Sequence, residues 1–225
     1  MNKKLLIWDI DGTLIDCGAA GRQAMDRTFK ELFDIDDAFQ GVSMAGRLDQ
    51  VILKDALTKH CIELANLDAF YKRYEEVLDQ VLSDIDVRLC EGIADVLAYT
   101  ASRENLLNVI STGNCQVGAW LKLKHAGIDH YFEHGGFGCG FSEREELVGQ
   151  IIEDVEKRYK INFGEKDVVV IGDTPHDITS GKHHHATTIA VLTGHHSKEA
   201  LAIYKPTFII ESFAQIKDFI SMLEV

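Results

Sequence analysis

The first residues suited to chemistry are two carboxylates near the N-terminus. An apolar run ends in the segment Asp9-Ile10-Asp11-Gly12-Thr13. Asp9 and Asp11 are therefore expected to leave a buried strand at its carboxyl end, where open α/β sheets bind their ligands. The side-chain period of a strand is two, so both carboxylates should point the same way, and a divalent cation would offset their repulsion. Taken alone, Asp11-Gly12 fits an ordinary turn after a strand equally well.

A second group of acids follows another apolar run. Val168 to Ile171 leads into Gly172-Asp173-Thr174-Pro175-His176-Asp177, in which Pro175 is suited to the first turn of a helix. Carboxylates are costly to cluster without a ligand, so packing alone explains two such strand ends poorly. A hard cation such as Mg²⁺ shared between these two strand ends accounts for both groups.

A third apolar run ends in hydroxyl and amide groups. It continues into Ser111-Thr112-Gly113-Asn114, ahead of a predicted helix from Cys115 to Ala126. A hydroxyl with free backbone amides at a helix N-terminus can bind phosphate. Thr and Asn are also ordinary helix caps, so this segment alone does not identify a phosphate site.

These residues need a parallel sheet to bring them together. Short apolar runs closed by polar or glycine-rich turns predict buried strands at 4–10, 106–111, 167–171 and 187–192. Helical periodicity follows at 146–159 and 213–223, and Pro206 is expected to precede a further strand. The alternation predicts an α/β fold with a Rossmann-like parallel sheet covered by helices on both faces.

The segment from Gly18 to Val87 interrupts this alternation, because its apolar residues follow only helical spacing. We expect a small all-helical cap over residues 18–87, inserted after the first strand, and an α/β core from residues 1–17 and 88–225. Substrate choice should reside in the cap, since its loops can vary without disturbing the sheet.

The three motifs, in this order, resemble the haloacid dehalogenase-like hydrolase superfamily and its phosphoglycolate-phosphatase-like branch. The resemblance rests on Asp9-x-Asp11-Gly12-Thr13, Ser111-Thr112-Gly113-Asn114 and Gly172-Asp173-Thr174-x-x-Asp177, and it covers essentially the whole chain. It implies a phosphatase that forms an aspartyl-phosphate on Asp9, with Asp11 protonating the leaving alcohol and then activating water.

The resemblance also implies the remaining roles. Asp9, Asp173 and the backbone carbonyl of Asp11 would hold Mg²⁺, with Asp177 supporting that shell. Thr112 and the amide of Gly113 would bind the phosphoryl oxygens, with Asn114 as a further substrate contact. Such an arrangement is physically sensible, since covalent catalysis divides the displacement into two steps while metal and donors stabilise the charge on the transferred group.

Three places depart from the usual family pattern: Arg144, the run His183-His184-His185, and Arg47 within Gly46-Arg47-Leu48-Asp49. Where the family supplies a lysine between the second and last motifs, the best match here is Arg144, whose fixed charge suits a carboxylate and a phosphoryl group. Arg144 also fits a solvated residue of a first helical turn. In the predicted cap, Arg47 either reaches the site and selects an acidic substrate or simply begins a helix.

Other conspicuous segments point to structure rather than chemistry. The run His183-His184-His185 is interpreted as surface histidines, because adjacent helical residues do not face one another. The glycine-dense stretch from His134 to Phe141 lacks the context of a dinucleotide site and predicts a close backbone approach near Arg144. The five cysteines are odd in number and scattered, which is typical of buried thiols in a reducing cytoplasm.

Charge and composition limit the partners. The net charge of −13 argues against nucleic acid as a partner and requires local positive charge for an anionic substrate. The apolar run Leu5 to Trp8 is too short for a membrane span. We therefore expect a cytoplasmic protein that acts on a small-molecule phosphate ester, with phosphoglycolate as the family's suggestion. A phosphomutase of the same superfamily and a phospho-accepting or binding module without turnover remain alternatives, and the oligomeric state is open.

Overall fold

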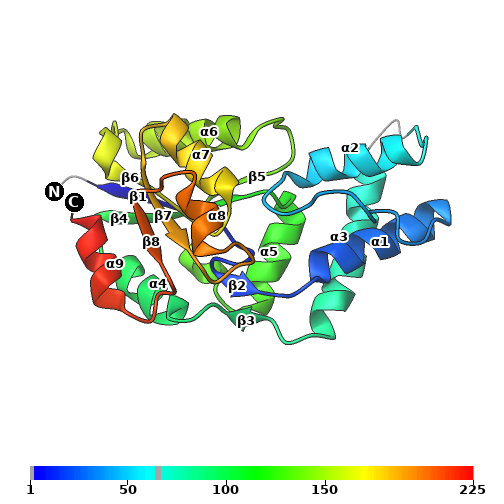
Figure 1. Ribbon diagram of the computed structural model, residues 1–225, viewed down its shortest axis with the longest axis horizontal. Helices are drawn as coiled ribbons and strands as arrows, with labels where there is room; N and C mark the ends of the chain where they lie inside the picture. Colours follow the sequence, from blue (N-terminus) through cyan, green and yellow to red (C-terminus); the bar gives the residue numbers. More distant parts are fainter. Residues whose placement is uncertain (1–2, 64–66, 225) are drawn as a thin grey trace.

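The computed structural model describes residues 3–63 and 67–224, and within them a parallel sheet forms the centre of the fold (Figure 1). The strand order is β5-β4-β1-β6-β7-β8. The strands are β1 (Lys4–Trp8), β4 (Leu106–Thr112), β5 (Gly135–Phe137), β6 (Val168–Gly172), β7 (Thr187–Val191) and β8 (Phe208–Ile210). The predicted fold class is confirmed, and all four predicted strands are present with ends shifted by a residue or two. The strand β5 was not predicted, because its sequence is rich in glycine.

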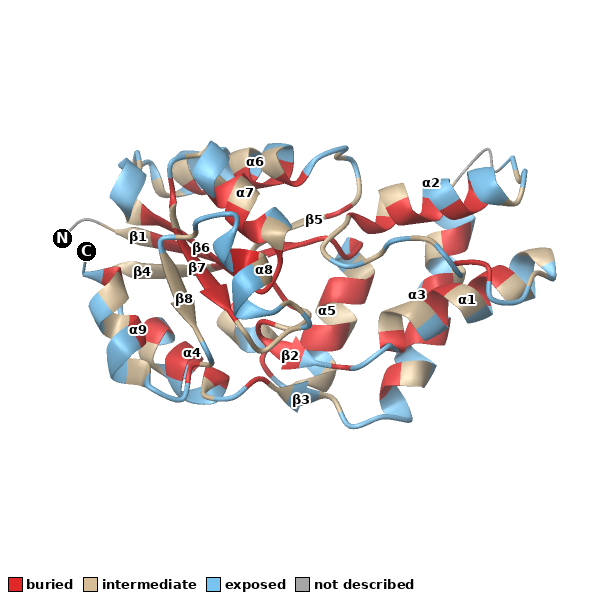
Figure 2. Ribbon diagram, in the orientation of Figure 1, coloured by how far each residue is buried: buried red, intermediate tan, exposed pale blue. Residues whose placement is uncertain are grey.

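The two faces of β1 pack against different helices, because its side chains alternate in direction. Leu6 and Trp8 join one apolar cluster with α4, α5 and α9, while Leu5 and Ile7 join another with α6. Figure 2 shows the buried strands between these helical layers. The helices are α4 (Ile93–Ala101), α5 (Gln116–His125), α6 (Arg144–Tyr159), α7 (Pro175–His183), α8 (Lys198–Ala202) and α9 (Ile216–Leu223), with 3₁₀ turns η1 (Asp129–Tyr131) and η2 (Glu165–Asp167).

Three further helices lie beyond the carboxyl ends of the strands (Figure 1). They are α1 (Ala20–Phe33), α2 (Asp49–Lys59) and α3 (Asp68–Ser83), and we call them the cap helices. Their buried side chains, Phe29, Phe70 and Tyr74 among them, form an apolar cluster separate from those of the sheet. No strand interrupts the described part of residues 18–87; residues 64–66 lie outside the description. The division into a cap at 18–87 and a core at 1–17 and 88–225 remains a proposal.

A short antiparallel pair connects the cap helices to the sheet. It consists of β2 (Ile15–Asp16) and β3 (Arg88–Leu89), and the Arg88 guanidinium donates to Asp16 at 3.0 Å. This pair places the chain entering the cap helices beside the chain leaving them. It was not predicted, because two-residue strands carry no periodicity that a sequence pattern reveals.

Several local expectations need correction. The last helix begins at Ile216 rather than Phe213, and the Phe213 ring instead packs 5.7 Å from the ring of Trp8. All five cysteines are free, but Cys61 is exposed and Cys139 is only partly buried, so the expectation of burial was wrong for these two. Among the described residues, no helix is both long and apolar enough to cross a bilayer.

Candidate active site at the carboxyl ends of the strands

The predicted site residues meet because β1 lies between β4 and β6. Trp8 is in register with Ile110 on one side and Ile171 on the other, so the segments that follow these residues leave the sheet at one edge. A left-handed turn at Gly12, with φ of 83°, follows directly after Asp11, and the Thr193 hydroxyl donates to the Gly12 carbonyl at 2.6 Å. The turn fixes the direction of the chain just beyond the two acids.

Three carboxylates converge at this edge, from the segments that follow β1 and β6 and from the first turn of α7. Asp9, Asp173 and Asp177 each bring an oxygen within 4.8 Å of the others, and all three residues are buried. Asp177 also caps α7: its Oδ2 accepts from the backbone amide and hydroxyl of Thr174 at 3.0 and 2.6 Å, while Pro175 occupies the first helical turn, as predicted.

The Arg144 guanidinium lies within this acidic cluster. It is buried at the start of α6, and its Nη2 donates to Asp9 Oδ1 and Asp177 Oδ1, each at 2.7 Å, and to the Ser111 carbonyl at 2.9 Å. The structure thus brings Arg144 to the acids and removes the alternative of a solvated first-turn residue.

One guanidinium does not balance three buried carboxylates. Burial, followed by repulsion from Asp177, raises the pKa of Asp9 to about 7 despite the Arg144 charge. Burial and repulsion from Asp9 raise the pKa of Asp173 to about 8. The cluster is short of positive charge, and its ligands are hard carboxylate oxygens, so its residues fit a divalent cation such as Mg²⁺.

The individual oxygens indicate which acids are free to bind a cation. Both oxygens of Asp177 already accept hydrogen bonds, from Arg144 and Thr174. Asp173 receives, from the side chains of the described residues, a single long contact of 3.5 Å, donated by the Thr13 hydroxyl. It packs so closely against Gly194 that a Cβ there would lie 1.7 Å from Asp173 Oδ2. Asp173 is therefore the freer ligand, and Asp177 is suited to a supporting position.

Asp11 has a different environment, although it lies only two residues beyond Asp9. Its two oxygens accept from the Lys122 ammonium at 2.8 and 2.7 Å, and Oδ2 also accepts from Asn114 Nδ2 at 2.7 Å. Burial alone would raise the pKa of Asp11, but Lys122 and the Asn114 hydrogen bond lower it overall. The Asp11 carboxylate is not part of the three-acid cluster, so the expectation that the Asp9 and Asp11 side chains share one cation is not met.

Lys122 was missed by the sequence analysis. It is 3% exposed on α5, and its ammonium also donates to Asn114 Oδ1 at 2.7 Å. A pattern was present: Cys115, Gly118, Ala119 and Lys122 recur at the spacing of one buried helical face. A lysine on such a face is rarely buried without an acidic partner, which would have singled it out.

The segment Ser111-Thr112-Gly113-Asn114, predicted to bind phosphate, lies where β4 passes into α5. Thr112 is buried, and its hydroxyl accepts from Asn114 Nδ2 at 2.7 Å. Gly113 lies against the chain before α2: a Cβ there would be 2.1 Å from the Arg47 carbonyl oxygen, and the Asp49 amide donates to the Gly113 carbonyl at 2.7 Å. Only glycine fits this approach.

The glycine-dense stretch makes its closest approach at the same motif. A Cβ on Gly138 would lie 1.9 Å from the Gly113 carbonyl oxygen, and the Gly138 amide donates to the Asn114 carbonyl at 2.8 Å. The predicted close backbone approach is present, but the structure places it at Gly113 and Asn114.

The structure also places Arg47 and the three-histidine run. Arg47 borders the same cavity as Asp9 and Asp11, and its guanidinium donates to Asp55 at 2.7 Å and to the Ser43 carbonyl at 2.9 Å. A role for Arg47 in selecting an acidic substrate stays a prediction. His183 and His185 are exposed. His184 is half-buried, with a ring nitrogen 2.7 Å from the Glu145 carbonyl.

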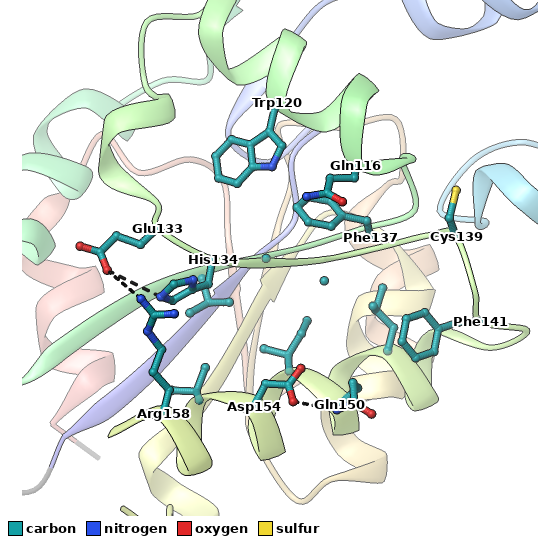
Figure 3. Close-up of a pocket in the computed structure, with 16 residues that line it drawn as sticks. Gln116, Trp120, Glu133, His134, Phe137, Cys139, Phe141, Gln150, Asp154 and Arg158 are labelled. Carbon is teal, nitrogen blue, oxygen red and sulfur yellow. Dashed lines mark hydrogen bonds and ion pairs between the residues drawn. The ribbon is translucent and has the colours of Figure 1, made fainter. Parts of the chain in front are cut away.

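The acids open into a cavity of about 290 Å³ between the sheet edge and the cap helices. Its lining includes Asp9, Asp11, Thr112 and Lys122 from the sheet side and Arg22 and Tyr74 from the cap helices. A larger cavity of about 550 Å³ lies along β5 between α5 and α6. Figure 3 shows its lining, in which Trp120 and Phe137 face Asp154 and Arg158. The larger cavity contains none of the converging acids, so the smaller one is the candidate active site.

The chain also resembles known proteins over nearly its whole length. Residues 6–191 match the family model described as haloacid dehalogenase-like hydrolase. The chain is 25% identical to a phosphoglycolate phosphatase of Colwellia psychrerythraea, with 95% of each chain covered. It is 24% identical to a pyrophosphatase, PpaX, of Anoxybacillus flavithermus, with 100% of this chain and 99% of that protein covered.

Solved structures share the fold. A predicted phosphatase from Clostridium acetobutylicum superposes with a TM-score of 0.74 at 18% identity, covering 100% of both chains. CbbY from Rhodobacter sphaeroides, solved in complex with phosphate, superposes with a TM-score of 0.68 at 15% identity, covering 95% of this chain and 96% of that one.

Proposed function

The chain belongs to the haloacid dehalogenase-like hydrolase family, and we propose that it is a Mg²⁺-dependent phosphatase that carries the phosphoryl group on Asp9 during turnover. Its curated relatives are phosphatases, which supports a hydrolase acting on phosphate esters. The observation that carries the proposal is the convergence of the Asp9, Asp173 and Asp177 carboxylates with too little positive charge to balance them. Asp11 lies next to this cluster and is held by Lys122 and Asn114.

The first step is transfer of the phosphoryl group to Asp9. A carboxylate oxygen of Asp9 attacks phosphorus, and the bond to the leaving oxygen breaks as the new bond forms. Asp11 donates the proton that the departing alkoxide requires. Because Lys122 and Asn114 lower the pKa of Asp11 in the free protein, this step starts from the minor, protonated form of Asp11. Arg144 holds Asp9 by its 2.7 Å hydrogen bond, while the Thr112 hydroxyl and the Gly113 amide bind phosphoryl oxygens, with Asn114 holding Thr112 and Asp11 in place.

The second step returns Asp9 to its starting state. Asp11, now deprotonated, takes a proton from water, and the water oxygen attacks phosphorus. The bond between phosphorus and Asp9 breaks, inorganic phosphate leaves, and the Asp9 carboxylate is restored. Asp11 alternates between acid and base, which is consistent with its place beside the cavity rather than within the acidic cluster.

Asp9, Asp173 and the backbone carbonyl of Asp11 would hold Mg²⁺, and the bound cation would supply the charge that stabilises the transferred phosphoryl group. Asp177 would support this set, because both of its oxygens are engaged by Arg144 and Thr174. Arg144 takes the place of the lysine that the family usually supplies.

The substrate is a small phosphate compound. A cavity of about 290 Å³ holds a small leaving group beside the phosphoryl site, and the cap helices line its outer part. The names of the relatives point to phosphoglycolate and to pyrophosphate as the first substrates to assay. Arg22 and Arg47 both line the cavity. Each is paired with an acid, Arg22 with Asp26 at 2.6 Å and Arg47 with Asp55 at 2.7 Å, so either guanidinium has to leave its partner to contact an acidic substrate.

The test is phosphate release from p-nitrophenyl phosphate by purified protein, with Mg²⁺ and with EDTA. Arg158→Gln is a matched control, because it removes a charge from the larger cavity. Metal-dependent release that persists in this control and stops in Asp9→Asn is the expected result. Release that is equal in EDTA would contradict the metal requirement. An absence of release from every phosphate ester would favour a binding module, and interconversion of sugar phosphates without release would favour a mutase.

A further inference from the structure

Tyr74 places an uncommitted hydroxyl in the candidate active site. The residue lies on α3 and is 0% exposed, and its ring stacks on Phe70 with centroids 6.3 Å apart. Its hydroxyl lines the cavity yet finds no hydrogen-bond partner among the described residues. A buried hydroxyl without a partner is costly, so its position calls for a ligand.

The position beside this hydroxyl is open because residue 21 is glycine. A Cβ on Gly21 would lie 3.8 Å from Tyr74 Oη and 3.5 Å from Lys122 Nζ. The three N–H groups of Lys122 are matched by three acceptors, two oxygens of Asp11 and one of Asn114. Tyr74 is therefore the polar group here with hydrogen-bonding capacity to spare.

We call the space next to Gly21, Tyr74 Oη and Lys122 Nζ the subsite. In the proposed mechanism Asp11 contacts the leaving oxygen, and Lys122 Nζ lies 2.7 Å from Asp11. The subsite is therefore close to the scissile bond. Burial and the nearby Asp49 raise the pKa of Tyr74 well above its usual range, which keeps the hydroxyl protonated and able to donate.

We infer that the Tyr74 hydroxyl, over Gly21 and beside Lys122, binds an oxygen atom of the leaving group close to the scissile ester oxygen. The ligand class is a short leaving group with an acceptor oxygen, either a hydroxyl or a carboxylate. The inference rests on the proposed phosphatase function and goes beyond it, because it assigns a residue that selects among phosphate esters.

The experiment compares 2-hydroxyethyl phosphate, phosphoglycolate and ethyl phosphate in the wild type and in Tyr74→Phe, all with Mg²⁺. The wild type should have a higher kcat/KM for 2-hydroxyethyl phosphate and phosphoglycolate, whose leaving groups carry a further oxygen, than for ethyl phosphate. Tyr74→Phe should reduce that preference about three- to tenfold, the size of one neutral hydrogen bond. A greater loss for phosphoglycolate would identify a carboxylate as the ligand, and a greater loss for 2-hydroxyethyl phosphate would identify a hydroxyl.

Two further variants separate binding from structure. Gly21→Ala places a methyl group in the subsite at ordinary contact distance from Tyr74 Oη and Lys122 Nζ, and it should reduce the same preference. Tyr71→Phe, on the same helix but outside the cavity lining, should leave it unchanged. The Tm of Tyr74→Phe should not fall, since the change removes an unpartnered hydroxyl.

The inference and the proposed function fail in different ways. Hydrolysis of all three esters with a preference that Tyr74→Phe does not alter would overturn the inference alone. A fall in Tm for Tyr74→Phe without a change in preference would show a structural hydroxyl and would also overturn it. Absence of hydrolysis of every ester by the wild type would overturn both.

Discussion

Asp9 and Asp11 follow the same strand two residues apart, yet their surroundings differ in charge. Asp9 lies among Asp173 and Asp177 with a single guanidinium, and its pKa is raised by burial and by these neighbours. Asp11 is paired with the buried Lys122, and its pKa is lowered. Asp9 thus shares the Arg144 guanidinium with another carboxylate, while Asp11 is paired with the Lys122 ammonium from α5.

This difference assigns metal binding and nucleophilic attack to Asp9 and proton transfer to Asp11, although the two residues are only two positions apart. The Asp9 region fits an external cation and a covalent nucleophile, because its carboxylates are buried and underneutralised. The Asp11 region has its geometry fixed by Lys122 and Asn114 without a metal. Proton transfer can therefore be positioned by the sheet side of the cavity alone, while the cap helices are free to select the leaving group.

The largest effect is expected from Asp9→Asn. The amide keeps the volume but cannot act as the nucleophile, so turnover should fall about a thousandfold or more. The substitution also removes a carboxylate whose ionisation is disfavoured in the fold, so the free energy of unfolding without metal should not decrease. Steady-state phosphate release and thermal unfolding measure the two effects. Near-normal turnover in Asp9→Asn would show that Asp9 is not the nucleophile.

Asp11→Asn should lower turnover about a hundred- to ten-thousandfold, because it removes proton transfer but leaves the acidic cluster intact. The loss should be larger for ethyl phosphate than for p-nitrophenyl phosphate, whose leaving group needs little protonation. Stabilisation by Mg²⁺ should persist. Equal losses for the two esters would argue that Asp11 does not act as the acid.

Lys122→Met tests whether the built-in cation positions Asp11. We expect turnover of ethyl phosphate to fall about 10- to 100-fold, the size seen when a supporting contact to a functional group is lost. The loss should be smaller for p-nitrophenyl phosphate, since the effect acts through the acid. Lys124→Met, an exposed change on the same helix, is the matched control. Identical kinetics in Lys122→Met and Lys124→Met would contradict the proposal that Lys122 positions Asp11.

The smallest effect concerns stability and pH. In the metal-free protein, Asp9 and Asp173 have folded-state pKa values of about 7 and about 8, above the ordinary 3.8. Between the ordinary pKa of 3.8 and these raised values, the folded state binds more protons than the unfolded state. The stability that the protonated forms of Asp9 and Asp173 contribute is therefore fully present below about pH 4 and is lost as the pH rises through 7 to 8.

Mg²⁺ relieves the same repulsion, so it should raise the Tm by a few degrees at pH 8 and by less at pH 5. Thermal unfolding of the wild type and of Asp173→Asn, with and without Mg²⁺, measures this difference. If Mg²⁺ raised the Tm equally at both pH values, or still raised it in Asp173→Asn, the metal would not bind at the acidic cluster.

Most of the fold was predictable because buried parallel strands are continuous apolar runs ending in recognisable turns. The same argument placed Asp9, Thr112 and Asp173 at one edge of the sheet. It failed for β5, where the glycines of 135–136 carry no apolar pattern, and for β2 and β3, which are too short.

The finer site geometry depends on contacts that no local pattern contains. Lys122 reaches Asp11 from a helix more than a hundred residues further along the chain. Arg47 lines the cavity, but its guanidinium is paired with Asp55. The position of the Tyr74 hydroxyl depends on how α3 packs against α1 and α5. Periodicity identifies which face of a helix is buried, but it does not identify which side chain of another element meets that face.

The central claim is that Asp9 carries the phosphoryl group, and acid-quenched single turnover with peptide mass spectrometry tests it most directly. The protein is mixed with Mg²⁺ and excess p-nitrophenyl phosphate, quenched within one turnover and digested. We predict that the peptide containing Asp9 gains the mass of one phosphoryl group, and that this gain is absent in EDTA and in Asp9→Asn. Full turnover with no modified Asp9 peptide at any quench time, or with the phosphoryl group on another residue, would contradict the account.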